Sequence, residues 1–235
     1  MIYLETYLPS CERSTFNSLR QEVSDVLSDL FEGMSYIAEA IALSTPEGQS
    51  VNRLAGRVQT VVLDAGDVLT ALSLPFSLVE LGDKFSDFCT QSMSHLERLD
   101  AFRTMIFTDT ASLIKDTCES IGLIDRFSTE LSADCLETLA KVVGIAGVIL
   151  YTSTLITHGK DLVAWGQDPH RTWSAGLLLG GEILKTLIRL TVSGLMVATA
   201  MSSFALVSPW ILFALCITAF VISLSLFFGK KVSQI

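Results

Sequence analysis

The sequence has little of the chemistry on which enzymes and metalloproteins depend. Its three histidines, His95, His158 and His170, lie far apart, and its five cysteines form no CxxC pair. It lacks the GxSxG, GxxxxGK[ST] and GxGxxG motifs of nucleophile, phosphate and dinucleotide sites. These absences predict a protein that is not an enzyme and that uses no metal ion or cofactor. The cysteine pattern also favours a reducing compartment over a secretory one.

Charge is missing from one long part of the chain. Residues 190–229 are 40 consecutive positions without Asp, Glu, Lys, Arg or His, and Ser208 and Pro209 mark a turn in the middle of them. The second arm, Trp210 to Phe228, would be about 28 Å long as a helix at ~1.5 Å per residue, which matches the hydrocarbon core of a bilayer. The block therefore predicts a transmembrane helical hairpin. The alternative is a soluble protein that hides the hairpin in its core.

The two arms also carry repeated side chains on one face. Small residues at every fourth position let membrane helices approach closely. The stripes that we expect to pack are Gly194, Ala198 and Ser202 on the first arm, and Leu215, Ala219 and Ser223 on the second.

Basic residues flank the block on both sides. Lys185 and Arg189 precede the hairpin, Lys230 and Lys231 follow it, and the turn between the arms has no charge. The positive-inside rule then places both termini in the cytosol. The first 20 residues contain no long apolar run, so we expect no signal peptide.

The region just before the hairpin is apolar but interrupted. Val142 to Gly159 lies between Lys141 and Lys160, and we expect it to be buried in protein or to lie in the membrane interface. Further on, Glu182, Lys185 and Arg189 recur at i, i+3 and i+7, which predicts a helix with one narrow charged stripe. Its basic side chains either reach lipid headgroups or form an i, i+3 ion pair within a core helix.

The front half of the chain is acidic. Residues 1–139 hold 22 of the 25 acidic residues and 9 of the 16 basic ones, which argues against a nucleic-acid partner. Apolar residues at steps of three and four predict helices over residues 14–43, from residue 51 to just before Pro75, over residues 76–93 and over residues 99–121. These helices predict an antiparallel bundle with acids on its solvated outer faces.

One acidic face is a candidate for binding partners. Asp25, Asp29 and Glu32 are spaced at i, i+4 and i+7, so they share one side of the first helix. A basic surface of a partner protein would meet all three carboxylates together.

The hydrophobic block, with its central turn and basic ends, resembles the bilobed hairpin of chlamydial inclusion-membrane proteins. The resemblance covers about a sixth of the chain. It implies export as a secreted effector by type III secretion, insertion into the membrane of a pathogen-containing vacuole, a role in virulence, and termini that bind host proteins.

A second resemblance is to Pex11-type peroxisomal membrane-elongation proteins. It rests on the C-terminal hairpin and on the stretch DTCESIGLIDRF, residues 116–127. It implies a membrane-shaping activity, but the acidic first helix departs from that family's basic amphipathic helices.

The sequence as a whole predicts an all-α fold, a helical bundle plus a C-terminal transmembrane helical hairpin. We expect an acidic cytosolic bundle over residues 1–139, an amphipathic or interfacial region over 140–189, the hairpin over 190–229 and a short basic tail over 230–235. Its expected partners are the lipid bilayer and other proteins. The expected role is that of a non-enzymatic adaptor that presents its acidic domain to cytosolic proteins, ahead of membrane shaping.

Overall fold

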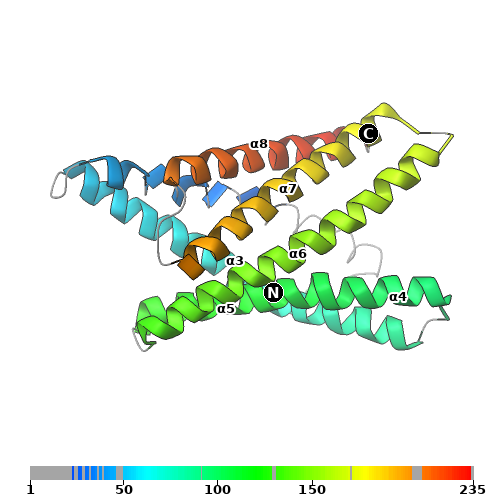
Figure 1. The fold of residues 1–235 in the computed structure, drawn as a ribbon, viewed down its shortest axis with the longest axis horizontal. Helices are drawn as coiled ribbons and strands as arrows, with labels where there is room; N and C mark the ends of the chain where they lie inside the picture. The colour runs from blue at the N-terminus through cyan, green and yellow to red at the C-terminus, as the bar shows by residue number, and fades with distance from the viewer. Residues whose placement is uncertain are drawn as a thin grey trace.

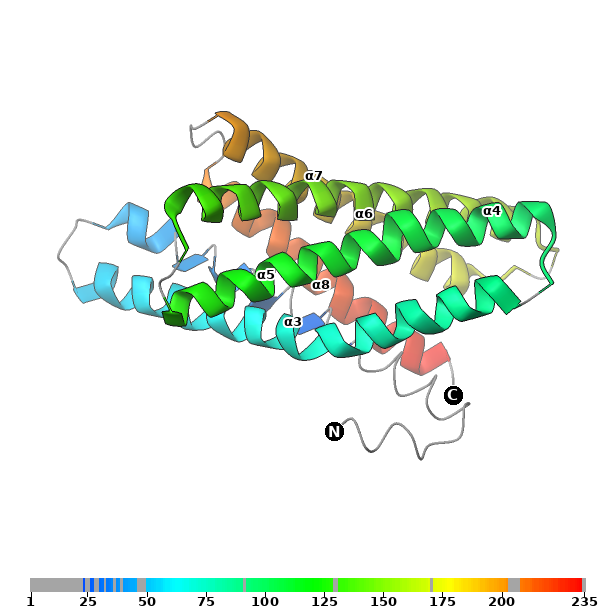
Figure 2. The same cartoon turned by 90° about the horizontal axis from the view of Figure 1, so that it is seen from below.

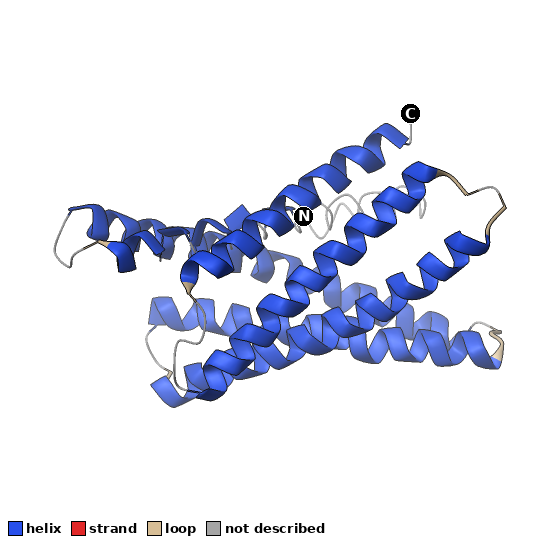
Figure 3. Ribbon diagram, turned by 45° about the horizontal axis from the view of Figure 1, so that its top comes forward, coloured by secondary structure: helices blue, strands red, loops and turns tan. Residues whose placement is uncertain are grey.

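The fold is all-α, as predicted. The computed structural model describes residues 23, 26–27, 30–31, 33–35, 37–38, 40–45, 50–90, 92–128, 131–169, 171–202 and 208–233, and these contain helices and no strand (Figure 3). The elements are α3 (Ser50–Thr90), α4 (His95–Thr104), the π-helix η1 (Met105–Asp109), α5 (Thr110–Ser128), α6 (Ala133–Gln167), α7 (Trp173–Ser202) and α8 (Pro209–Ser233) (Figure 1).

The helices run up and down in chain order. α3 packs against α5, α5 against α6, α6 against α7 and α7 against α8. From below, α4, η1 and α5 form one long rod beside α3 (Figure 2). Each helix therefore contacts its neighbour in the sequence, which is the arrangement expected of helices joined by short turns.

Residues near the N-terminus join the two ends of this series. Phe31 lies against α3, since a Cβ on Gly66 would be 3.7 Å from its side chain, and Gly33 lies against Ile217 and Cys216 of α8. The amide of Asn52 donates hydrogen bonds to Ala42 O at 2.7 Å and to Thr45 O at 3.3 Å. The bundle is thus closed between α3 and α8.

The predicted helix limits differ from the structure in two regions. α3 passes through Pro75 and continues to Thr90, so the helices predicted on either side of Pro75 are one. Proline is tolerated inside a helix that its neighbours hold in place, and α3 packs against α5. The helix predicted over residues 99–121 lies within the longer rod from His95 to Ser128.

The expected domain limits fall inside helices. The limit at residues 139 and 140 lies within α6, and the limit at 189 and 190 lies within α7. Val142 to Gly159 is the middle of α6, a helix of 35 residues. The helix therefore extends well beyond the apolar stretch at both ends.

Helix ends at the α3–α4 and α6–α7 turns are held by specific contacts. Ser94 and Glu97 form a capping box at the start of α4, in which each side chain bonds to the other's backbone N–H. In the α6–α7 turn, the indole N–H of Trp165 donates to Thr172 O at 3.1 Å, and Arg171 lies 5.6 Å from the Trp165 ring centroid. Both turns lie at the same end of the molecule (Figures 1 and 2).

The distribution of polar and apolar side chains differs from that in a water-soluble bundle. The described core holds mainly small residues, and Ser35, Ser153, Thr186, Ser193 and Ser223 are buried within it. Large apolar side chains point outward instead, and Trp173 and Leu177 are 83% and 73% exposed. Contiguous exposed apolar surface marks contact with lipid or with other proteins.

Four helices are long and apolar enough to cross a membrane. They are Ser50–Thr90, Ala133–Gln167, Trp173–Met201 and Trp210–Gly229. No more than 22% of the apolar stretch in any of them is buried against the rest of the chain. The hairpin helix α8 is therefore not enclosed as the core of a soluble protein would be, and the outer surface is compatible with a bilayer.

Candidate functional site: a charged cavity inside the bundle

A cavity of about 760 Å³ lies among α3, α5, α6, α7, α8 and the N-terminal residues. Many side chains that line it carry hydroxyl groups or charges. The charged ones are Asp67, Glu80, Asp109, Lys115, Asp116, Glu119, Glu182, Lys185 and Arg189. Charged side chains inside a bundle with an apolar exterior are the usual sign of a functional site in membrane proteins.

One side of the cavity is a polar stripe on α5. Ser112, Lys115, Asp116 and Glu119 occupy i, i+3, i+4 and i+7, so they lie on one face of the helix, and all four line the cavity. Lys115 Nζ lies 2.7 Å from a carboxylate oxygen of Glu119, and the two side chains are 23% and 22% exposed. Ile114 and Ile121 point outward from the same helix. α5 is thus amphipathic with its charged face turned inward.

A second stripe runs along α7. Glu182, Lys185, Thr186, Arg189 and Ser193 all line the cavity. Lys185 and Glu182 form an i, i+3 ion pair at 3.5 Å, with side chains only 12% and 18% exposed. Of the two interpretations left open by the sequence, the structure agrees with the ion pair inside the bundle.

The two stripes meet through α6. Tyr151 of α6 lines the cavity between them, and the guanidinium of Arg189 lies 6.0 Å from its ring centroid. A cation near an aromatic face is favoured by about 0.5–2 kcal/mol, more where water is excluded.

The π-helix η1 turns two polar side chains toward the cavity. One residue beyond it, the Thr110 hydroxyl donates to Met105 O at 3.0 Å. Asp109 then reaches Lys84 of α3 at 2.9 Å, and the Thr108 hydroxyl lies 2.9 Å from the Ser153 hydroxyl of α6. Single π-helical turns inside α-helices are frequent at functional sites because they shift side chains by one position.

Beside η1, Arg103 fastens α4 to α6. Its Nη1 donates to the hydroxyl of Ser153 at 3.2 Å and its Nη2 to the hydroxyl of Thr157 at 3.0 Å. Its Nε bonds to Asp100, which also accepts a hydrogen bond from Lys160. The Lys160 contact lowers the pKa of Asp100 below its ordinary value, and the Arg103 contact adds to this.

The basic residues predicted to flank the hairpin lie in two different environments. Lys185 and Arg189 lie in the middle of α7 and line the cavity. The backbone at Lys230 and Lys231 belongs to the last turns of α8, and their side chains are outside the described part. The predicted partner face, Asp25, Asp29 and Glu32, also lies outside the described residues.

Of the two stripes predicted to pack, the one on α8 is more buried than the one on α7. On α8, Ala219 and Ser223 are buried and line the cavity, and Leu215 is half-buried. On α7, a Cβ at Gly194 would meet no atom within 4 Å, Ala198 is half-buried, and the Ser202 side chain is outside the described part.

The closest helix contacts involve other glycines. A Cβ at Gly144 would lie 2.7 Å from Val197, and one at Gly147 would lie 2.6 Å from the Ser193 hydroxyl, so α6 and α7 touch there. Between α7 and α8, a Cβ at Gly181 would lie 2.9 Å from Leu226. Small residues do bring these helices together, but on faces that spacing within the hairpin does not identify.

The α5 stripe was missed in the sequence analysis, although its spacing was visible. Its charged residues belong to the acidic half, which was interpreted as a solvated outer surface. Within the described residues, no group of three or more His, Cys, Asp or Glu side chains could hold a metal ion. What the cavity offers chemically is therefore hydrogen bonding and charge of both signs.

Comparison with protein families, with curated proteins and with solved structures finds no match for this chain.

Proposed function

We propose that this chain is an integral membrane protein, without enzymatic activity, that presents a charged end to protein partners in the cytosol. The observation that carries the membrane assignment is the apolar exterior of four helices around a polar interior. In lipid, polar groups must be satisfied inside the protein, so this arrangement is the one that a bilayer favours.

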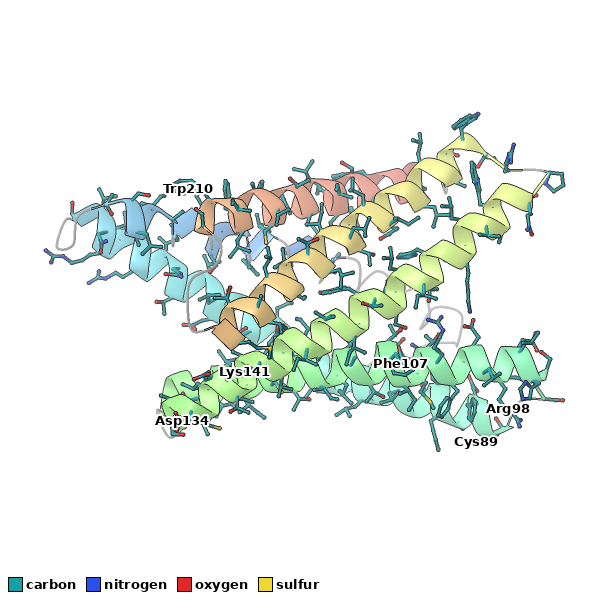
Figure 4. The ribbon with its side chains drawn as sticks, in the orientation of Figure 1. Cys89, Arg98, Phe107, Asp134, Lys141 and Trp210 are labelled. Atoms are coloured by element: carbon teal, nitrogen blue, oxygen red, sulfur yellow. The ribbon has the colours of Figure 1, made fainter. Side chains whose placement is uncertain are left out.

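The end that carries the α3–α4 and α6–α7 turns is the one assigned to the cytosol. Arg98 and Cys89 mark it in Figure 4, and Asp134 and Lys141 mark the opposite end. The first end has more exposed bases than the other: Lys84, Arg98, Lys160 and Arg171 lie there, against Arg53 and Arg57 near the start of α3 at the opposite end (Figure 1). α8 also finishes toward it, since Gly229 lies against Leu178 near the start of α7. An excess of Lys and Arg in short loops favours the cytosolic side.

The same end offers a surface for recognition. Exposed acids lie among the bases, including Asp83 and Asp87 on α3 and Asp161 on α6. Mixed charge at the rim of an interface sets partner choice and association rate more than it sets affinity. The resemblance to inclusion-membrane proteins supports the same role, and it implies that the partners are host proteins and the membrane that of a vacuole.

The membrane assignment is tested by extraction and labelling of the intact protein. We expect it to stay in the membrane pellet after an alkaline carbonate wash. In a cysteine-free background, an impermeant thiol reagent added from the cytosolic side should modify cysteines placed at Ser94 and Arg171 but not at Ser132 or Ser208. Release into the supernatant, or modification of all four from one side, would reject the proposal.

The adaptor role is tested by reversing charge at one end only. Asp83→Lys with Asp87→Lys should change the set of proteins crosslinked to the chain in cells. Asp134→Lys with Glu137→Lys makes the same change of charge at the opposite end and should leave that set unaltered. Equal effects of the two pairs, or no effect of either, would contradict the adaptor role at this end.

A further inference from the structure

We propose that the cavity is a water-filled chamber that admits small hydrophilic cations from the aqueous phase. This goes beyond the adaptor role, which involves only the outer end of the bundle. The inference rests on the reversal of polarity between the outside and the inside of the bundle, on the balance of charge around the cavity and on its size.

The reversal of polarity is seen on three helices at neighbouring positions. On α3, Ser77 lines the cavity while Leu78 is 50% exposed on the outside. On α5 the corresponding pair is Ser112 and Ile114, and on α6 it is Thr154 and Ile156. Each helix thus gives hydroxyl groups to the cavity and aliphatic side chains to the exterior. The hydroxyls of Ser77 and Thr154 donate to carbonyl oxygens of their own helices, so the need for water comes mainly from the charged side chains that line the space, which would cost several kcal/mol each to dry.

The charge around the cavity favours cations. Six acidic side chains line it against three basic ones. Two of the three bases are held by acids of their own helix, Lys115 by Glu119 and Lys185 by Glu182. Lys84, which lies outside the lining, pairs with Glu80 and Asp109, so six acidic side chains stand against four basic ones and the net charge around the cavity is negative. Clefts lined by one sign of charge concentrate the opposite ion about 10- to 1000-fold, and a lining of mixed sign with a net negative charge should act at the low end of that range.

One carboxylate oxygen beside the cavity lacks a hydrogen-bond donor in the described part of the chain. Oδ1 of Asp109 accepts from Lys84 at 2.9 Å, whereas Oδ2 is buried and receives no hydrogen bond from the part of the chain that the structure describes. A buried carboxylate oxygen is costly unless a donor reaches it. Because Oδ2 is also closed off from solvent in this arrangement, the Asp109 side chain must turn before water or a cationic solute in the cavity can supply that donor.

The volume suits an organic cation. Sites for small molecules commonly enclose about 300–1000 Å³, and about 760 Å³ falls within that range. A quaternary ammonium group with a short tail fits such a space. We therefore choose two thiol reagents of similar size and opposite charge as probes, trimethylammonioethyl methanethiosulfonate and sulfonatoethyl methanethiosulfonate.

The experiment uses the full chain in proteoliposomes, with all five native cysteines replaced. Single cysteines replace Ser77, Ser112 or Thr154 in the cavity, and matched controls replace Leu78, Ile114 or Ile156 on the outside of the same helices. We expect the cationic reagent to modify the three cavity positions about tenfold faster than the anionic one, and neither reagent to modify the outer positions. Asp116→Asn should reduce the difference in rate at Ser112→Cys, because it removes one negative charge from the lining.

A cysteine at Ser94, in the exposed turn before α4, should react with both reagents and shows that the preparation is competent. The proposal fails if the Ser94 cysteine reacts while the cavity positions do not, or if the two reagents modify the cavity positions at equal rates. It also fails if the outer positions react as fast as the cavity ones, because the space between the helices would then be no distinct chamber. A variant that is not monodisperse in detergent is replaced by a cysteine at Ser73 or Thr70, which line the same cavity.

Discussion

Arg103 on α4 and Ser153 on α6 are joined by two hydrogen bonds although they lie 50 positions apart in the sequence. Nη1 of Arg103 donates to the backbone oxygen of Ser153 at 3.3 Å and to its hydroxyl at 3.2 Å. Ser153 is 4% exposed, so its hydroxyl has little water to bond with instead. Because η1 begins two residues after Arg103, this contact fixes the position from which Thr108 and Asp109 reach the cavity.

Replacing Arg103 should loosen the joint between α4 and α6. Arg103→Met keeps the aliphatic stem but removes every hydrogen bond to Ser153, Thr157 and Asp100. We expect the free energy of unfolding to fall by about 2–4 kcal/mol, because charged hydrogen bonds at a largely buried site are lost together. Unfolding in mixed micelles, followed by circular dichroism, measures the change. Arg98→Met, at an exposed position of the same helix, should change it by less than about 0.5 kcal/mol; equal losses would disprove the special role of Arg103.

The charged end of the bundle should weaken in acid. Hydrogen bonding by Lys160 lowers the pKa of Asp100 from its ordinary value of 3.8, and the Ser94 hydroxyl and backbone lower the pKa of Glu97 from 4.5. A carboxylate whose pKa is depressed by folding adds stability above its unfolded pKa and loses that contribution as pH falls through the folded value. We therefore expect α4 to be stable at pH 5 and above and to loosen progressively below about pH 4.

Pepsin cleavage within α4, normalised to cleavage of an unfolded peptide at each pH, follows this change. The variant Glu97→Gln with Asp100→Asn should be cut readily at pH 5 and should show little further change on acidification. A wild-type profile that is flat from pH 5 to pH 2 would rule out these two carboxylates as the cause.

The all-α class and the second arm of the hairpin could be predicted because their sequence patterns are compatible with few structures. An apolar stretch without charge, such as Trp210 to Phe228, must be a membrane helix or a buried one, and α8 extends only slightly beyond it. The end predicted at Pro75 failed for a local reason. A proline breaks a helix in water, but packing against α5 keeps α3 continuous.

The cavity could not be predicted, because periodicity shows which residues share a helix face but not where that face points. The stripe of Lys115, Asp116 and Glu119 would face solvent on a soluble bundle. In a bundle with lipid outside, the same stripe must turn inward. Because residues 1–139 were interpreted as a solvated domain, the charged face of α5 was expected to point outward, whereas it points into the bundle. The faces of α6 and α7 that meet at Gly147 likewise depend on long-range packing that spacing alone does not specify.

The contact between α6 and α7 should depend on one small residue. A Cβ at Gly147 would lie 2.6 Å from the Ser193 hydroxyl oxygen and 3.2 Å from its Cβ, so Gly147→Val must push the helices apart. We expect a loss of about 1–3 kcal/mol in the free energy of unfolding, as for other overpacked sites. Gly194→Val makes the same change in α7, where a Cβ meets no atom within 4 Å, and should be tolerated. If Gly194→Val is the more damaging of the two, the stripe predicted from the hairpin is the real contact.

The fold should need an ion pair between positions 182 and 185, but either position should be able to carry the acid. Their side chains are 18% and 12% exposed, so Lys185→Glu would put two carboxylates together inside the bundle, and breaking such a pair typically costs about 3–5 kcal/mol. We expect this variant to yield little monodisperse protein and to melt at a lower temperature. Exchanging the two residues, Glu182→Lys with Lys185→Glu, restores opposite charges on the same face of α7 and should recover most of the lost stability.

If Lys185 instead lay at the lipid headgroups, the single variant would fold normally and lose only membrane affinity. A double variant no more stable than Lys185→Glu alone would show that each residue depends on other neighbours and not on the pair.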